Sequence, residues 1–326
     1  MAMLAHMTSI AIIGAGAVGG YYGALLAKAG HDVRFLMRRD LEAVRQGGID
    51  VRSPRGDFVV QQPGVFARPE EIGAVDWVIC SLKATALGDA QALVAPCVGP
   101  QTRIVALMNG LEVEERFGEW FGPERVFGGM AFVCINRGEP GVIHHLEYGR
   151  VSIGHLEDEP AALDRLRELL ESGAIEVTVA PNLRFARWEK LCWNVPFNGL
   201  SVAAGGIGTR LIVEDFALRR TAERAMREVV AAGNADLAAL GGSARLDVDE
   251  VVGRMLRQTE SMGDYRTSMA IDYVAGRPLE VEAILGEASR RAVALGVPTP
   301  TVDALYALVR MADLRRRSLV PVISAE

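Results

Sequence analysis

The fold of this chain is decided by the stretch Ile10-Ala11-Ile12-Ile13-Gly14-Ala15-Gly16-Ala17-Val18-Gly19. Its four leading apolar residues predict a strand, and residues 18–29 predict a helix. Between them lies the pattern GxGxxG, and this strand–turn–helix context is typical of a dinucleotide-binding turn. The first glycine permits the tight turn, the second lets a pyrophosphate approach the backbone, and the third lets helix and strand pack closely. We therefore expect cofactor contacts from Gly14, Ala15, Gly16, Ala17, Val18 and Gly19.

Apolar strand patterns alternate with helical patterns as far as about residue 180. Strands are predicted at residues 32–37, 76–81 and 102–107, and the alternation indicates βαβ crossovers and a mainly parallel sheet. Residues 126–135 and 142–153 predict two more strands, which would extend the sheet in antiparallel fashion. We therefore expect an α/β fold, a doubly wound Rossmann sheet, over residues 8–180.

Long amphipathic helical patterns replace the strand patterns after Pro181. The clearest helices are predicted at residues 219–240, 248–260 and 277–295. Glycine and proline residues at 241–242 and 296–300 mark their ends. An all-α domain is therefore expected over residues 181–317.

Length and charge exclude some classes of function. The chain has 326 residues, enough for two domains, and a net charge of −6. This acidic balance disfavours a nucleic-acid partner, and a solvated helix end explains the basic run Arg315-Arg316-Arg317. The four cysteines form no CxxC pair and have no histidine at metal-ligand spacing. We therefore predict free thiols and no metal site.

Residues 7–27 carry no charge, and a stretch of this length suggests a membrane span. However, five glycines interrupt it and no basic residue precedes it. Because glycine costs a helix about 1 kcal/mol per residue, a strand and turn are favoured. The prediction is a soluble, cytoplasmic protein without a membrane partner.

The end of the second predicted strand bears on the choice of cofactor. An NAD-binding fold usually carries an acidic residue there, which holds the ribose hydroxyls. Here the strand ends Leu36-Met37-Arg38-Arg39, and two guanidinium groups would attract a ribose 2′-phosphate. NADP is the predicted cofactor, while the nearby Asp40 leaves NAD open.

A polar stripe lies on an apolar helical pattern after the domain break. Lys190, Asn194 and Asn198 follow one another at intervals of four residues, which places them on one helical face. Buried polar groups need partners, so a substrate would suit this face; from spacing alone, a solvated stripe suits it equally. Pro196 removes one backbone hydrogen bond and is expected to kink the helix.

These motifs together resemble the ketopantoate reductase family, and the likeness runs from about Ile10 to Arg315. Besides the glycine turn and the polar helix, it is carried by Ser81-Leu82-Lys83, Met108-Asn109-Gly110, Thr267-Ser268-Met269 with Asp272 and Glu280, and Gly296-Val297-Pro298-Thr299-Pro300. The resemblance implies that residues 181–317 form a substrate-binding domain like the C-terminal domain of 6-phosphogluconate dehydrogenase. It also implies reduction of 2-dehydropantoate to (R)-pantoate with NADPH, in pantothenate and coenzyme A biosynthesis.

Roles for individual residues come from the resemblance. Lys190 and Glu280 match the two catalytic residues. Lys190 matches a lysine that protonates the carbonyl oxygen as hydride reaches the carbonyl carbon. Glu280 matches a glutamate that hydrogen-bonds the substrate hydroxyl, assists this proton transfer and lies at the cofactor. Substrate-binding positions are matched by Asn194, Asn198, Ser268 and Asn109, and cofactor-binding positions by Arg38, Lys83 and again Asn109.

Other interpretations remain open at this point. Taken alone, Glu280 could complement a helix dipole, Ser268 could make a local hydrogen bond, and Asn109 could form a turn. The glycine-rich residues 200–208 depart from the family pattern beside the predicted site. The substrate could therefore be another branched or aromatic 2-oxo acid, and the protein could instead be a non-catalytic NADP-sensing regulator. A homodimer is possible.

Overall fold

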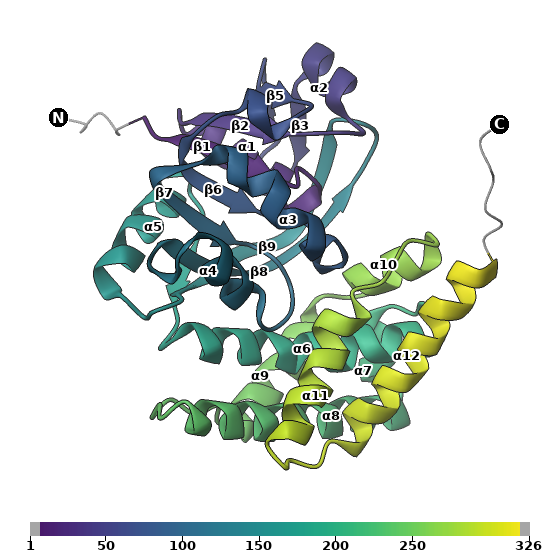
Figure 1. Cartoon of the computed structure of the whole chain (residues 1–326). Helices are drawn as coiled ribbons and strands as arrows, with labels where there is room; N and C mark the ends of the chain where they lie inside the picture. The colour runs from purple at the N-terminus through teal and green to yellow at the C-terminus, as the bar shows by residue number, and fades with distance from the viewer. Residues whose placement is uncertain (1–6, 320–326) are drawn as a thin grey trace. The chain divides into compact units, whose positions relative to one another are not determined.

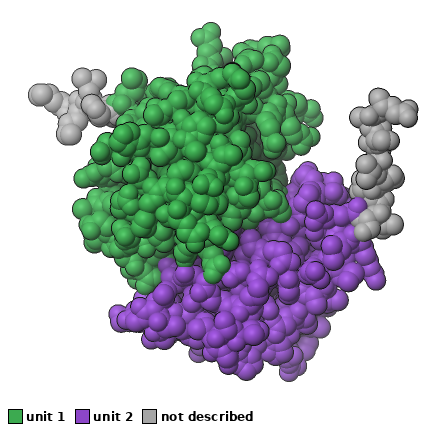
Figure 2. Space-filling view, viewed as in Figure 1, with its two compact units in different colours: residues 1–108, 112–183 green, residues 109–111, 184–326 purple. Residues whose placement is uncertain are grey.

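A computed structural model describes residues 7–319 and divides the chain into two compact units (Figure 1, Figure 2). Unit 1 holds residues up to Met108 together with Glu112–Leu183. Unit 2 holds the short segment Asn109–Leu111 together with the chain from Arg184 onward. The second unit thus includes three residues, Asn109–Leu111, that precede the rest of the unit by more than 70 positions.

Unit 1 is built on a mixed sheet that contains ten strands within the described residues. Six neighbouring strands, counted from one edge of the sheet, are parallel and run in the order β5-β2-β1-β6-β7-β8. Apart from an inserted hairpin, this is the strand order of a dinucleotide-binding Rossmann fold. The predicted α/β fold is confirmed. The strands are β1 Ser9–Ile13, β2 Asp32–Leu36, β3 Ile49–Arg52, β4 Phe58–Val60, β5 Gly64–Phe66, β6 Val75–Cys80, β7 Val98–Ala106, β8 Val126–Arg137, β9 Val142–His155 and β10 Val177–Val179.

A long hairpin extends this sheet beyond its parallel part. Strands β8 and β9 pair antiparallel along most of their length, which confirms the predicted extension. Strand β9 then pairs with β3 and β10, and β3 pairs with β4. The helices of unit 1 are α1 Ala17–Lys28, α2 Leu41–Gly47, α3 Leu87–Val94, α4 Val113–Phe121 and α5 Pro160–Ser172, with short 3-10 turns η1 Pro69–Glu71, η2 Ala84–Ala86, η3 Ala95–Cys97 and η4 Pro123–Arg125.

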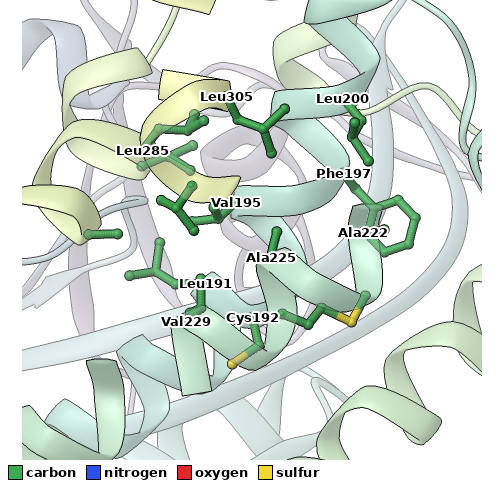
Figure 3. Close-up of a cluster of buried hydrophobic side chains, with 14 of the residues drawn as sticks. Leu191, Cys192, Val195, Phe197, Leu200, Ala222, Ala225, Val229, Leu285 and Leu305 are labelled. Carbon is green, nitrogen blue, oxygen red and sulfur yellow. The ribbon is translucent and has the colours of Figure 1, made fainter. Parts of the chain in front are cut away.

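Unit 2 contains helices and connecting loops but no strand within its described residues, so the predicted all-α fold is confirmed. Its core lies between α6, α8, η5 and α12, where Leu191 and Val195 are buried among Val229, Leu285 and Leu305 (Figure 3). This apolar face fixes α6, which carries the predicted polar stripe. The helices are α6 Leu183–Ala203, α7 Thr209–Glu214, α8 Phe216–Ala239, α9 Val248–Ser261, α10 Ser268–Val274, the π-helical turn η5 Glu282–Gly286, α11 Glu287–Ala294 and α12 Pro300–Leu319.

The prediction of one helix over residues 277–295 is wrong at its start. Residues 277–280 are not helical, and the helix begins at Val281. Proline disfavours helical backbone at the residue before it, and Pro278 follows Arg277. The Arg277 amide instead donates to the Asp272 carbonyl at 2.9 Å, after Gly276 at φ +68°, and so closes α10. Glu280 therefore stands immediately before a helix.

The four cysteines are free and buried, as predicted for free thiols. Burial raises the pKa of the Cys80 thiol to about 12 and that of Cys97 to about 11. These thiols therefore stay protonated and unreactive near neutral pH. Among residues 7–319, no helix has both the length and the apolar character needed to cross a membrane.

Candidate active site

The GxGxxG turn joins β1 to α1. Gly14 has φ +95°, and a Cβ there would lie 2.7 Å from the Leu82 backbone nitrogen, so only glycine fits. A Cβ on Gly19 would lie 2.6 Å from the Gly14 carbonyl oxygen. At Gly16, by contrast, the nearest protein atom would be 4.0 Å away. Packing within the protein does not require the second glycine, but close approach of a ligand would.

The beginning of α1 suits an anion. Gly16 is its N-cap, no side chain caps the helix, and its first turn contains no acidic residue. Unpaired backbone N–H groups and the helix dipole attract phosphate at such an end. The turn therefore fits the pyrophosphate of a dinucleotide, with Ala17, Val18 and Gly19 as the first helical residues.

Two predicted cofactor residues follow the carboxyl ends of parallel strands that both pair with β1. Strand β1 pairs with β2 on one side and β6 on the other, so the residues after them gather at one edge of the sheet. Arg38 follows β2 and is exposed, as is Lys83 after β6. Within residues 7–319, neither Arg38 nor its neighbour Arg39 forms an ion pair. The basic end of β2 fits a ribose 2′-phosphate.

Three predicted residues of unit 2 meet in one hydrogen-bonded group. The Asn109 side chain donates from Nδ2 to Glu280 Oε2 at 3.2 Å, and its Oδ1 accepts from Asn194 Nδ2 at 3.4 Å. Asn194 and Glu280 are buried, with 4% and 7% of their surface exposed. Residues separated by 171 positions in the chain are thus brought together.

Gly110 lets Asn109 enter this group. Its φ is +105°, and a Cβ would lie 2.8 Å from the carbonyl oxygen of Ala283 and 2.9 Å from its Cβ. Ala283 belongs to the π-helical turn η5, and turns of this kind occur often at functional sites. Neither the turn nor this contact was predicted, since no local sequence pattern distinguishes a π-helical turn from an α-helix.

We expect Gly110→Ala to lower kcat/KM by roughly 10–100-fold, because the added methyl group would push Asn109 away from Glu280. Gly296→Ala is the matched control: Gly296 also has positive φ, +67°, but a Cβ there meets nothing within 4 Å. Steady-state kinetics of the two variants measure the difference. Equal activities would mean that the contact with Ala283 does not position Asn109.

Lys190 and Asn194 lie one turn apart on α6, and Lys190 is half-buried. The preceding Glu189 pairs with Arg254 of α9 at 2.7 Å. Helix α6 continues through Pro196 to Ala203. Lys190, the first residue of the predicted polar stripe, is therefore one helical turn from the hydrogen-bonded group of Asn109, Asn194 and Glu280.

Asn198 is hydrogen-bonded to the start of α10, the helix whose first residue is Ser268. The Asn198 side chain is buried, donates to the Asn194 carbonyl at 3.0 Å and accepts from the Met269 amide at 3.2 Å. The Thr267 hydroxyl accepts from the Ala270 amide at 3.2 Å and caps α10. Ser268 is exposed, and its hydroxyl makes no hydrogen bond within the described residues. Asn198 thus fixes the helix that presents Ser268.

A Rossmann sheet with an anion-binding turn, together with a helical unit that carries a lysine, a buried carboxylate and amides, defines a two-domain oxidoreductase of the nicotinamide-dependent class. The family model for ketopantoate reductase PanE/ApbA matches residues 10–158, and the model for its C-terminal domain matches residues 182–313. The chain therefore belongs to the ketopantoate reductase family, as its motifs predicted.

Similar proteins and solved structures support membership of the ketopantoate reductase family. The chain is 37% identical over 314 residues to a 2-dehydropantoate 2-reductase of Nostoc sp., covering 94% of this chain and 96% of the relative. It is similar to a 2-dehydropantoate 2-reductase structure from Geobacter metallireducens, with 40% identity, a TM-score of 0.89 and coverage of 93% and 99%. A D-mandelate dehydrogenase structure with NADH shares the fold, with a TM-score of 0.85, 22% identity and coverage of 95% and 99%.

Proposed function

We propose that the protein catalyses the NADPH-dependent reduction of 2-dehydropantoate to (R)-pantoate. The main support is the buried group Asn109–Asn194–Glu280, one helical turn from Lys190, in a chain whose relatives carry this activity as their name. In this proposal unit 1, residues 8–180 of the predicted division, binds NADPH, and the helical residues 181–317 bind the substrate.

The proposed mechanism assigns each residue one task. When bound, NADPH supplies a hydride to the carbonyl carbon of the substrate. Lys190 donates a proton from Nζ to the carbonyl oxygen, where negative charge develops, and regains a proton from water. Glu280 accepts a hydrogen bond from the substrate hydroxyl, and Asn109 holds the glutamate in place.

The remaining residues bind and orient. The exposed Ser268 hydroxyl donates to the substrate carboxylate, and Asn194 binds the substrate beside Lys190. Asn198 contributes indirectly, because its hydrogen bond with the Met269 amide keeps α10 in place. On the cofactor side, the glycine turn binds the pyrophosphate, Arg38 binds the 2′-phosphate and Lys83 lies at the cofactor edge of the site.

A panel of 2-oxo acids at saturating NADPH tests the substrate. We expect the highest kcat/KM for 2-dehydropantoate, with a loss of roughly 10–100-fold for 3,3-dimethyl-2-oxobutanoate. The second acid lacks only the hydroxyl group, so it would leave the Glu280 carboxylate without its partner. A higher kcat/KM for a branched or aromatic acid without this hydroxyl would replace the proposed substrate. No turnover of any acid would favour the NADP-sensing alternative.

Cellular location and assembly are part of the proposal. Four free, buried cysteines suit the reducing cytoplasm. A homodimer is supported by Leu308, Met311 and Leu314 of α12, which stand three residues apart on one side of the helix with 59%, 46% and 40% of their surface exposed. A related ketopantoate reductase of Staphylococcus aureus is described as dimeric.

A further inference from the structure

A carboxylate stands beside the basic end of β2, and it is already paired. Asp40 follows Arg38 and Arg39 directly and is the N-cap residue of α2. Its Oδ2 forms an ion pair and a hydrogen bond with the guanidinium of Arg137, the last residue of β8. Only 17% of the Asp40 side chain is exposed, against 37% for Arg137. The pair joins positions 97 residues apart within unit 1.

This carboxylate lies near the end of the second strand, where a Rossmann fold discriminates between NAD and NADP. An acidic side chain after the second strand favours NAD, because it accepts hydrogen bonds from the ribose hydroxyls and repels a 2′-phosphate. Asp40 has the chemistry for that task and stands four positions after the end of β2. The pairing with Arg137 occupies Oδ2 of Asp40 and compensates the negative charge of its carboxylate.

The charges at this edge favour the phosphate as a result. Arg38 and Arg39 are exposed and make no ion pair in the described part of the chain. With Asp40 neutralised by Arg137, both positive charges remain available. A phosphate monoester carries between one and two negative charges at neutral pH, so the local charges are complementary.

We propose that Arg137 determines the preference for NADPH over NADH by holding the Asp40 carboxylate away from the ribose 2′ position. This inference rests on the proposed function, because it concerns the cofactor of that reaction. Arg137 is a positioning residue: it acts on the cofactor through Asp40 and not by binding the phosphate itself. No motif marks it, since the pairing depends on the course of the long β8–β9 hairpin.

Four variants test this proposal: Arg137→Met, Asp40→Asn, the two combined, and Arg52→Met. The last removes the same charge from a comparable ion pair of unit 1, Arg52 with Asp50 at 3.2 Å. Calorimetry with 2′,5′-ADP and 5′-AMP measures the binding of the ribose 2′-phosphate without turnover. The ratio of kcat/KM for NADPH and NADH gives the same comparison in the reaction.

Arg137→Met should weaken 2′,5′-ADP binding roughly 10-fold, since a free carboxylate then faces the phosphate, and should leave 5′-AMP binding unchanged. Adding Asp40→Asn should restore 2′,5′-ADP binding, and Arg52→Met should have no effect. An unchanged preference in Arg137→Met, no restoration in the double variant, or an equal loss in Arg52→Met would each overturn the proposal. A wild-type protein that binds 2′,5′-ADP no better than 5′-AMP would instead refute the proposed NADPH dependence itself.

Discussion

Lys190→Ala should lower kcat by roughly 10²–10⁴-fold, the usual contribution of a general acid, while the dissociation constant for NADPH stays unchanged. The physical reason is the charge that develops on the carbonyl oxygen as hydride arrives. Without the ammonium group at Nζ, water must supply the proton. Lys190 is half-buried and one helical turn from Asn194, which is bonded to Asn109, so the proposed donor stands beside the proposed substrate contacts.

The presence of lysine rather than arginine at position 190 supports a role in proton donation. Only three lysines, Lys28, Lys83 and Lys190, occur among the 35 basic residues of the chain. At most other basic positions arginine supplies the positive charge, and arginine does not release its proton in proteins. A position that needed only a cation could have been arginine in this sequence. Lysine at position 190 is consistent with a need for a transferable proton.

Lys190→Arg separates charge from proton donation. If Lys190 donates the proton, arginine should be nearly as inactive as alanine; if it acts only by its charge, arginine should retain most of the activity. Lys28→Ala is the control, because Lys28 lies over the Phe58 ring at 4.3 Å on α1 and has no proposed role. Stopped-flow rates with deuterated NADPH measure the hydride step directly. Full activity of Lys190→Ala would refute the mechanism.

Local patterns in the sequence were sufficient to predict most of the fold. Alternating strands and helices predicted the parallel sheet, because hydrophobic periodicity is a property of consecutive residues. The hairpin β3–β4 was not predicted: β4 has only three residues, and an apolar run this short does not distinguish a strand from a loop. The start of the helix at Val281 was missed because a proline and a helix cap interrupt an otherwise helical sequence.

Local sequence patterns predicted the residues of the candidate site better than they predicted the contacts between them. Spacing put Lys190, Asn194 and Asn198 on one face of α6, but it did not show that Asn198 would bind the Met269 amide of α10. No local sequence pattern connects Asn109 to Glu280, because the two residues are 171 positions apart and are brought together only by the fold. The hydrogen-bond partners of Asn109, Asn194 and Glu280 are determined by tertiary packing, which no local pattern encodes.

The largest loss of stability is expected for Trp188→Ala, at about 3–5 kcal/mol. Trp188 on α6 is fully buried, and its ring packs so closely on α8 that a Cβ on Gly233 would lie 2.9 Å from it. Its indole Nε1 donates to Asp236 Oδ2 at 2.8 Å. Asp236 also faces Arg184 and Arg291, at 3.6 and 3.4 Å. Truncation would thus open a cavity and remove a hydrogen bond from a buried carboxylate.

Trp188→Phe distinguishes these two contributions, because phenylalanine fills most of the cavity but cannot donate to Asp236. We expect a cost of about 1–3 kcal/mol for this variant, between wild type and Trp188→Ala. Trp193→Phe is the matched control: Trp193 is only partly buried, and its indole donates to the neutral Thr259 hydroxyl at 2.9 Å. Urea denaturation followed by circular dichroism gives the free energies of unfolding. If Trp188→Phe were as destabilising as Trp188→Ala, the buried carboxylate rather than ring packing would dominate, and α6 would depend chiefly on that hydrogen bond.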